Sequence, residues 1–134
     1  MMQQYRRKNH SVSLVNYHLV WIPKRRKKIL IGDVENRLRT IVWEVCQEKE
    51  WKIIALEIMP DHVHLFVNVP PEIAPHQVAN AIKGRSSRLL RQEFPRLLKL
   101  PSLWTSSYFV STAGNVSSDT VRRYIEEQRH HDTT

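Results

Sequence analysis

Alternating apolar and polar residues mark four segments of the chain as β-strands. The first covers 13–22, where apolar side chains occupy both alternating sets of positions, so both faces of this strand are expected to be buried. Runs over 51–59 and 62–69 flank a turn and are predicted to pair as an antiparallel hairpin. A fourth strand is predicted over 103–112, which is rich in aromatic, β-branched and hydroxyl residues.

Apolar residues recur at three- and four-residue intervals in the segments between these strands. This spacing predicts amphipathic helices over 33–50, with Gly32 and Asp33 as turn and cap, and over 75–94. A last helix is predicted over 118–130. The resulting β-α-β-β-α-β order indicates an α+β fold: a ferredoxin-like or RRM-like split antiparallel sheet with an extra C-terminal helix. No repeat or linker divides the chain, so 1–134 is expected to be one domain.

The charge balance favours a polyanionic partner. Lys and Arg number 21 against 13 Asp and Glu, which gives a net charge of +8, and the pI is near 10. Because no apolar run is long enough to span a bilayer and no signal peptide opens the chain, nucleic acid is a better candidate than a membrane. The segment 1–11 is expected to be a loose basic arm. The single Cys46 excludes a disulfide framework within one chain and fits a reducing, intracellular location.

Two histidines stand one residue apart at the start of the third predicted strand, in the stretch PDHVHLFV. Residues i and i+2 of a strand point to the same face about 7 Å apart, so His62 and His64 can direct their rings at one ion. The pattern is equally compatible with two half-buried histidines that are satisfied by hydrogen bonds. Asp61 is expected to be a turn residue, with a hydrogen bond to a histidine as the alternative.

The last predicted helix places Tyr124 and Gln128 four residues apart, and hence on one face. A tyrosine in a helix is usually a packing residue, so this pair gains a chemical interpretation only together with the histidines. Glu126 and Glu127 flank the tyrosine and are interpreted as an exposed acidic face.

Four motifs in order resemble one family over nearly the whole chain. MPDHVHLFV, KGRSSRLL, LWTSSYFVSTAG and VRRYIEEQ are similar to the motifs of the TnpA family of single-tyrosine HUH transposases, found in IS200-like insertion sequences. The resemblance implies that Tyr124 is the nucleophile that attacks a DNA phosphodiester, and that His62, His64 and Gln128 are ligands of a divalent metal ion. Imidazole and amide ligands with open positions suit Mg²⁺ or Mn²⁺.

The resemblance also implies the substrate, the assembly and the location. It implies single-stranded DNA with subterminal hairpins, a homodimer whose active sites are shared between subunits, and cytoplasmic action on the nucleoid of a prokaryote. The loop 113–117 is predicted to be a hinge for the tyrosine helix. No ATP is needed for transfer through a phosphotyrosine, in agreement with the lack of a G-x-x-x-x-G-K-[ST] loop.

Basic and hydroxyl side chains in two segments are candidates for contacts with DNA phosphates. One set lies in the second helix and the other in the basic block after the first strand: Lys83, Arg85, Ser86, Ser87 and Arg88, and Lys24, Arg25 and Arg26. Gly84 interrupts the helix, and either close approach of a DNA backbone or close packing on the sheet would account for it. Trp104 and Tyr108 are expected to be core residues, with base stacking as the alternative.

Two rival functions remain open at this level. A non-catalytic RRM-like module shares the strand order, but its third strand should carry an aromatic-rich pattern, whereas this one begins with His-Val-His. A domesticated or plasmid-type HUH nicking endonuclease would cut hairpin DNA without mobilising an element, and would use the same residues.

Overall fold

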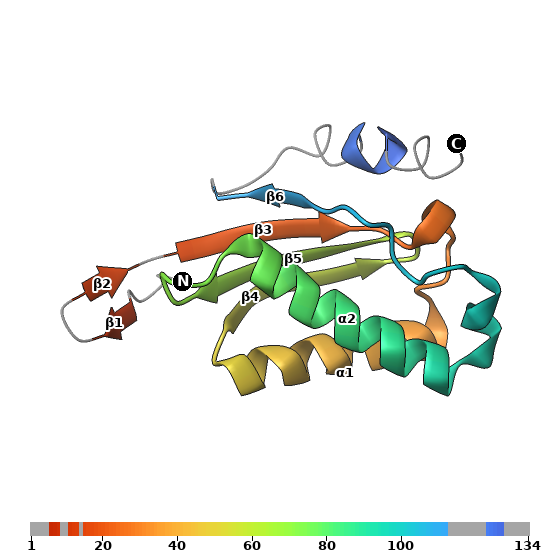
Figure 1. Cartoon of the computed structure of the whole chain (residues 1–134), viewed down its shortest axis with the longest axis horizontal. Coiled ribbons are helices and arrows are strands. Elements are labelled where there is room, and N and C mark those ends of the chain that lie inside the picture. Colours follow the sequence, from red (N-terminus) through yellow and green to blue (C-terminus); the bar gives the residue numbers. More distant parts are fainter. Residues whose placement is uncertain (1–5, 9–10, 14, 113–122, 128–134) are drawn as a thin grey trace.

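Four antiparallel strands form the central sheet, and two helices cover one of its faces (Figure 1). The computed structural model describes residues 6–8, 11–13, 15–112 and 123–127. The strands run in the spatial order β4-β5-β3-β6. Their bounds are β3 (Val15–Trp21), β4 (Lys52–Met59), β5 (His62–Val69) and β6 (Phe109–Ser111), and the helices are α1 (Gly32–Lys49) and α2 (Pro75–Glu93). The predicted ferredoxin-like α+β fold is confirmed.

The main core lies between the sheet and the two helices. Leu19 and Trp21 of β3 and Leu65 of β5 are fully buried there, because alternate residues of these strands face the helices. The apolar stripe predicted for the first helix is buried in full: Val34, Leu38, Ile41, Val42, Val45 and Cys46. Hydrophobic burial on this scale, at roughly 25 cal/mol per Å² of apolar surface, is the main stabilising contribution to the fold.

A second, smaller cluster covers the opposite face of the sheet. Val20 of β3 and Ile22, which follows the end of the strand, are fully buried against Ile125. Residue 125 belongs to the terminal helix, of which 123–127 are described as helical (Figure 1). Both faces of β3 are therefore buried, as the sequence predicts, and the terminal helix lies on the face that α1 and α2 leave open.

The N-terminal segment is ordered where it is described, so the prediction of a loose arm over 1–11 is wrong there. β1 (Arg6–Lys8) and β2 (Ser11–Ser13) pair as an antiparallel ribbon. The Arg6 guanidinium donates to the side-chain oxygen of Asn68 at 2.6 Å, to the Asn68 carbonyl at 3.0 Å and to the Glu50 carbonyl at 2.9 Å. This arginine therefore ties the ribbon to the end of β5 instead of remaining available as a basic arm.

The fourth strand is shorter than the predicted 103–112. β6 covers Phe109–Ser111, while Trp104 forms an isolated bridge with Pro23. Between them the carbonyls of Thr105 and Ser107 accept hydrogen bonds from the Lys83 ammonium at 2.8 and 3.1 Å. Because these carbonyls bond to a side chain, the segment bends away from a regular strand there.

The start of α1 differs from prediction in one detail. Gly32 has a φ of 58°, in the left-handed region that favours glycine, so the predicted turn is present. No side chain caps the helix, however, and Asp33 lies inside the first turn, where its charge is favourable next to the positive end of the helix dipole.

Cys46 is buried in the main core, and burial raises the pKa of its thiol to about 12. Since the thiolate is the reactive form, we expect Cys46 to resist alkylation in the folded protein and to react within minutes after denaturation. Mass spectrometry after iodoacetamide treatment, with and without guanidinium, measures this. Labelling at equal rates in both conditions would contradict the burial of this thiol.

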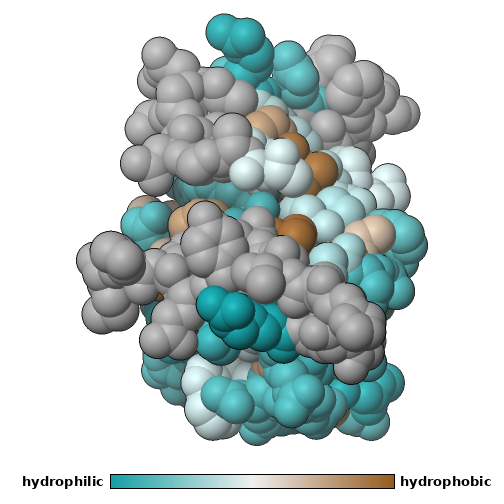
Figure 2. Space-filling view, turned by 90° about the vertical axis from the view of Figure 1, so that its left-hand side faces the viewer, coloured by the Kyte–Doolittle hydropathy of each residue, from teal (hydrophilic) through white to brown (hydrophobic). Residues whose placement is uncertain are grey.

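The coloured part of the face shown in Figure 2 is mainly hydrophilic. Seen from the end that carries the β1–β2 ribbon, a few hydrophobic residues show in a band across the middle (Figure 2). None of the helices within the described ranges has the length and apolar character needed to cross a membrane.

Candidate functional site on the open face of the sheet

The two predicted histidines lie at the start of β5 and face away from α1 and α2. Their ring centroids are 4.9 Å apart, and the rings are roughly perpendicular, at 66°. Val63, between them, is fully buried in the main core, so the alternation of the strand places both imidazoles on the open face. The sequence prediction of a shared face is confirmed.

Asp61 fixes the first imidazole. Its carboxylate lies 2.8 Å from Nδ1 of His62 and forms an ion pair with Nε of Arg26 at 3.1 Å. Since an ionised carboxylate can only accept, Nδ1 of His62 must carry the proton, and Nε2 keeps its lone pair. The contact predicted as the alternative role of Asp61 is therefore present, and Arg26 supports it.

A third histidine, His18 on β3, lies beside the second imidazole. Its Nε2 is 3.4 Å from Nδ1 of His64, with ring centroids 5.6 Å apart, and its ring also contacts Phe66. Sequence reasoning missed this residue. The signal was present, since His18 falls on the same alternating positions as Val20 and Ile22, but recognising it requires the register in which Val20 pairs with His64.

Burial is the main cause that lowers the pKa of His64 to about 4; the neighbouring His62 and His18 contribute to this, and Glu57 opposes it. Burial also lowers the pKa of His18. His64 is therefore neutral at pH 7. A neutral imidazole has one unprotonated ring nitrogen, and in His64 this is Nε2 in the tautomer whose Nδ1 donates to His18.

Tyr124 lies on the same face of the sheet as the histidines. Val20 pairs with His64 in β5 and with Phe109 in β6, and Tyr124 packs on the cluster of Val20 and Ile22 with its ring 5.8 Å from that of Phe109. Directly paired residues of an antiparallel sheet share a face. The tyrosine helix and the two imidazoles thus lie over the same surface, with β3 between them.

The Tyr124 hydroxyl lies 3.2 Å from the Ser107 hydroxyl. Burial raises the pKa of Tyr124, and the hydrogen bond from Ser107 opposes this change. Tyr124 is therefore a protonated phenol at neutral pH in this arrangement, and its use as a nucleophile requires activation.

Gln128, the predicted third ligand, and the predicted hinge 113–117 lie outside the described residues. Within the ranges that the structure describes, no group of three His, Cys, Asp or Glu side chains is arranged to hold a metal ion. His62 and His64 alone leave a metal site incomplete, so a further ligand has to come from another residue type or from another segment.

The predicted DNA contacts divide into two groups. α2 covers the face opposite the histidines, and Ser86 on it is fully buried, so the prediction that Ser86 contacts DNA is wrong. The Lys83 ammonium bonds to backbone carbonyls, and Arg85 forms a two-pronged ion pair with Glu48 of α1 at 2.9 and 2.7 Å. Intramolecular contacts account for both residues.

The remaining candidates lie at the surface. Ser87 is half-buried and Arg88 exposed on α2, while Lys24, Arg25 and Arg26 form a short 3₁₀ segment, η1 (Lys24–Arg26), after β3. Arg26 connects this segment to the site through Asp61. The basic block therefore adjoins the histidines, whereas the α2 cations do not.

Two other sequence interpretations are settled by packing. Trp104 is a core residue, as expected: it packs edge-on against Trp21 at 6.1 Å and donates to Ser86. A side chain at Gly84 would meet no atom within 4 Å, so close packing on the sheet does not explain this glycine.

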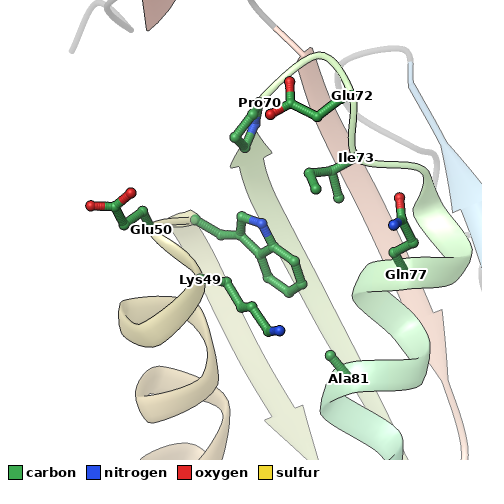
Figure 3. Close-up of a pocket in the computed structure, with 8 residues that line it drawn as sticks. Lys49, Glu50, Pro70, Glu72, Ile73, Gln77 and Ala81 are labelled. Atoms are coloured by element: carbon green, nitrogen blue, oxygen red, sulfur yellow. The ribbon is translucent and has the colours of Figure 1, made fainter.

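A pocket of about 280 Å³ lies at the far end of the helix layer (Figure 3). It opens between the end of α1, the end of β5 and the start of α2, and its walls include Glu50, Glu72 and Gln77. None of the predicted site residues lines it. Its walls carry two glutamates and one lysine, Lys49, a balance that does not favour a phosphate backbone, and the histidine face remains the candidate site.

Comparisons with known proteins show which proteins this chain resembles. The family model described as "Transposase IS200 like" matches residues 11–128. The ISDra2 transposase TnpA of Deinococcus radiodurans is 33% identical over 117 residues, which cover 85% of this chain and 84% of the relative. The transposase for insertion sequence element IS200 of Salmonella typhimurium is 28% identical over 119 residues, 87% of this chain and 78% of the relative.

Solved structures give the same result for the fold. A crystal structure of a Deinococcus radiodurans R1 protein assigned as a transposase superimposes with a TM-score of 0.85 and 32% identity, over 92% of this chain and 97% of that one. A REP-associated tyrosine transposase bound to a REP hairpin shares the fold at a TM-score of 0.55 and 17% identity, over 93% and 69% of the two chains. The fold is thus one that solved transposase structures share. Within that class, the chain belongs to the family of IS200-like transposases.

Proposed function

We propose that this transposase cleaves and rejoins single-stranded DNA, with Tyr124 as the nucleophile. The phenolic oxygen attacks the phosphorus of a DNA phosphodiester, the bond to the 3′ oxygen breaks, and the products are a free 3′-hydroxyl and a 5′-phosphotyrosine. The observation that carries the proposal is the shared sheet face, which holds both a half-buried tyrosine and the two imidazoles.

His62 and His64 are proposed to bind a divalent cation, Mg²⁺ or Mn²⁺, together with Gln128. The donor set fits, because Asp61 accepts from Nδ1 of His62 and Nδ1 of His64 can donate to His18, and each neutral ring then offers its Nε2 as a ligand nitrogen. When bound there, such a cation polarises the scissile phosphate and stabilises the leaving 3′ oxygen. The carboxylate of Asp61 keeps the His62 ring oriented, and Arg26 keeps that carboxylate in place.

Rejoining uses the bond that cleavage conserves. A phosphotyrosine is still a phosphodiester, so the 3′-hydroxyl of another strand end can attack it and release the tyrosine without ATP. We propose that the substrate is single-stranded DNA with hairpins and that a homodimer carries out the exchange. The basic segment Lys24, Arg25 and Arg26 is the proposed phosphate contact, because it adjoins the histidines. Arg88 and Ser87 lie on α2, on the other side of the sheet from the histidines, and are weaker candidates for contacts with DNA phosphates.

Incubation of the protein with single-stranded hairpin oligonucleotides and Mn²⁺ or Mg²⁺ tests the proposal. The expected product is a protein–DNA adduct that survives denaturation, together with a strand ending in a 3′-hydroxyl. Addition of a second oligonucleotide with a free 3′ end should consume the adduct and yield a joined strand. Cleavage without any joined strand would favour a nicking endonuclease over a transposase, and absence of both products would contradict the proposal.

Loss of His18 is expected to weaken the proposed metal site without removing a ligand. His18→Leu deletes the nitrogen beside Nδ1 of His64, and partners of this kind are typically worth about 10- to 100-fold in metal affinity. Titration with Mn²⁺ followed by electron paramagnetic resonance measures the affinity directly, without DNA. His18→Gln, which keeps a polar group there, should retain part of the affinity. Equal Mn²⁺ affinity in His18→Leu and the unmodified protein would show that His18 does not support the site.

A further inference from the structure

The buried ammonium of Lys83 is not explained by the proposed reaction. Lys83 belongs to α2, on the helix side of the sheet, and its Nζ donates to the carbonyls of Thr105 and Ser107 at 2.8 and 3.1 Å. It also lies 6.0 Å from the centre of the Tyr108 ring. Burial lowers the pKa of Lys83 to about 8. Removing a charged ammonium from water costs free energy, so a lysine in this position is expected to have a specific structural role.

A second contact from the same helix reaches the same segment. The buried Ser86 hydroxyl accepts a hydrogen bond from the Trp104 indole at 3.0 Å and donates to the Ile82 carbonyl at 2.7 Å. Lys83 and Ser86 are three residues apart, and so they lie on one side of α2. Together they attach residues 104–107 to the helix immediately before β6 begins.

Ser107 connects this attached segment to the open face. Its backbone carbonyl is bonded to Lys83, while its hydroxyl is 3.2 Å from that of Tyr124. Thr105 donates its backbone N–H to the Ile22 carbonyl at 3.1 Å, which fixes the segment against the end of β3. The main chain of Ser107 is thus held from the helix side, and its side chain contacts the tyrosine on the other side.

We propose that Ser107 is a positioning residue for Tyr124, and that Lys83 fixes Ser107 in place from the opposite layer of the protein. The Ser107 hydroxyl orients the phenol over the sheet and donates to its oxygen as negative charge develops there. Two sequence motifs contribute to this arrangement: KGRSS contains Lys83 and Ser86, which hold residues 104–107, and LWTSSYFV contains the segment that they hold. It rests on the proposed function in one respect, the role of Tyr124 as the nucleophile.

The energetic effect is that of one hydrogen bond to a developing anion. Burial raises the pKa of Tyr124, and donation by Ser107 works against this change. Ser107→Ala removes the donor and is expected to raise the pKa of Tyr124 further. The rate of adduct formation should then fall about three- to tenfold, the usual contribution of a single hydrogen bond.

The test is a pH titration of the tyrosines without DNA or metal, followed by NMR of ¹³Cζ-labelled tyrosine. Tyr124→Phe identifies the signal. Ser107→Ala should move its titration to higher pH, and Ser107→Thr, which keeps a hydroxyl, should restore it. Lys83→Met should move it in the same direction, because the carbonyls of residues 105 and 107 lose their donor. Ser106→Ala is the matched control, since the neighbouring Ser106 is exposed.

The outcomes separate this proposal from the proposed function. An identical Tyr124 titration in Ser107→Ala and the unmodified protein would overturn the role of Ser107, whatever the reaction. If Ser106→Ala moved the Tyr124 titration as far as Ser107→Ala does, the role of Ser107 would also be overturned. If Lys83→Met does not fold, Ser107→Ala and Ser107→Thr still decide the question. The absence of an adduct at Tyr124 in the DNA assay would instead overturn the role of this tyrosine as the nucleophile.

Discussion

Tyr124→Phe is expected to abolish the covalent protein–DNA adduct while leaving the fold intact. The phenylalanine ring can keep the packing on Phe109, Val20 and Ile22, because the substitution removes one oxygen atom from a half-buried side chain. The lost hydrogen bond to Ser107 should lower the free energy of unfolding by only about 0.5 to 1.5 kcal/mol. Loss of a nucleophile, in contrast, is expected to reduce cleavage at least about 10³-fold.

The measurement is gel electrophoresis under denaturing conditions after incubation with labelled hairpin DNA and Mn²⁺. Tyr108→Phe provides the matched control, because Tyr108 precedes β6 in the same segment but packs against the main core on the other face. Hairpin binding by both variants, measured by fluorescence anisotropy, should equal that of the unmodified protein. An adduct of normal yield with Tyr124→Phe would show that another residue attacks the phosphodiester.

Elements with a clear hydrophobic period could be predicted from the sequence almost to the residue. The hairpin of β4 and β5 and the two helices have such periods, and their observed bounds differ from the predicted ones by one residue or none. β6 could not be predicted, because its length depends on which backbone carbonyls bond to Lys83, a residue about 20 positions earlier. The order of the N-terminal ribbon likewise depends on Arg6 reaching Asn68 across the fold.

The candidate site shows the same division between local and long-range information. His62 and His64 could be paired from the period of a single strand, since that period alone decides their common face. His18 required the register between β3 and β5, and the contact of Tyr124 with Ser107 required the packing of the terminal helix. Ser86 was misassigned as a DNA contact because a serine beside arginines is typical of a phosphate site, whereas its burial follows from Trp104.

His64→Ala is expected to abolish metal-dependent cleavage. It should also lower the affinity for Mn²⁺ more than the loss of a supporting partner such as His18 does, which is typically about 10- to 100-fold. The His64 ring contacts the rings of both His62 and His18. The substitution removes one of the two proposed imidazole ligands, and the remaining amide and water ligands do not supply the affinity for Mn²⁺ that an imidazole nitrogen gives. His62→Ala should have a similar effect.

Affinity for Mn²⁺ measured by electron paramagnetic resonance, and cleavage measured on the same preparation, test this expectation together. The control is His76→Ala, which removes an exposed histidine of α2 on the far layer and should change neither quantity. Because the basic segment at Lys24, Arg25 and Arg26 is untouched, hairpin binding by His64→Ala should persist at a similar affinity. If His64→Ala binds Mn²⁺ and cleaves as the unmodified protein does, the paired imidazoles are structural. The open face would then need another account of how a protonated, half-buried tyrosine is activated.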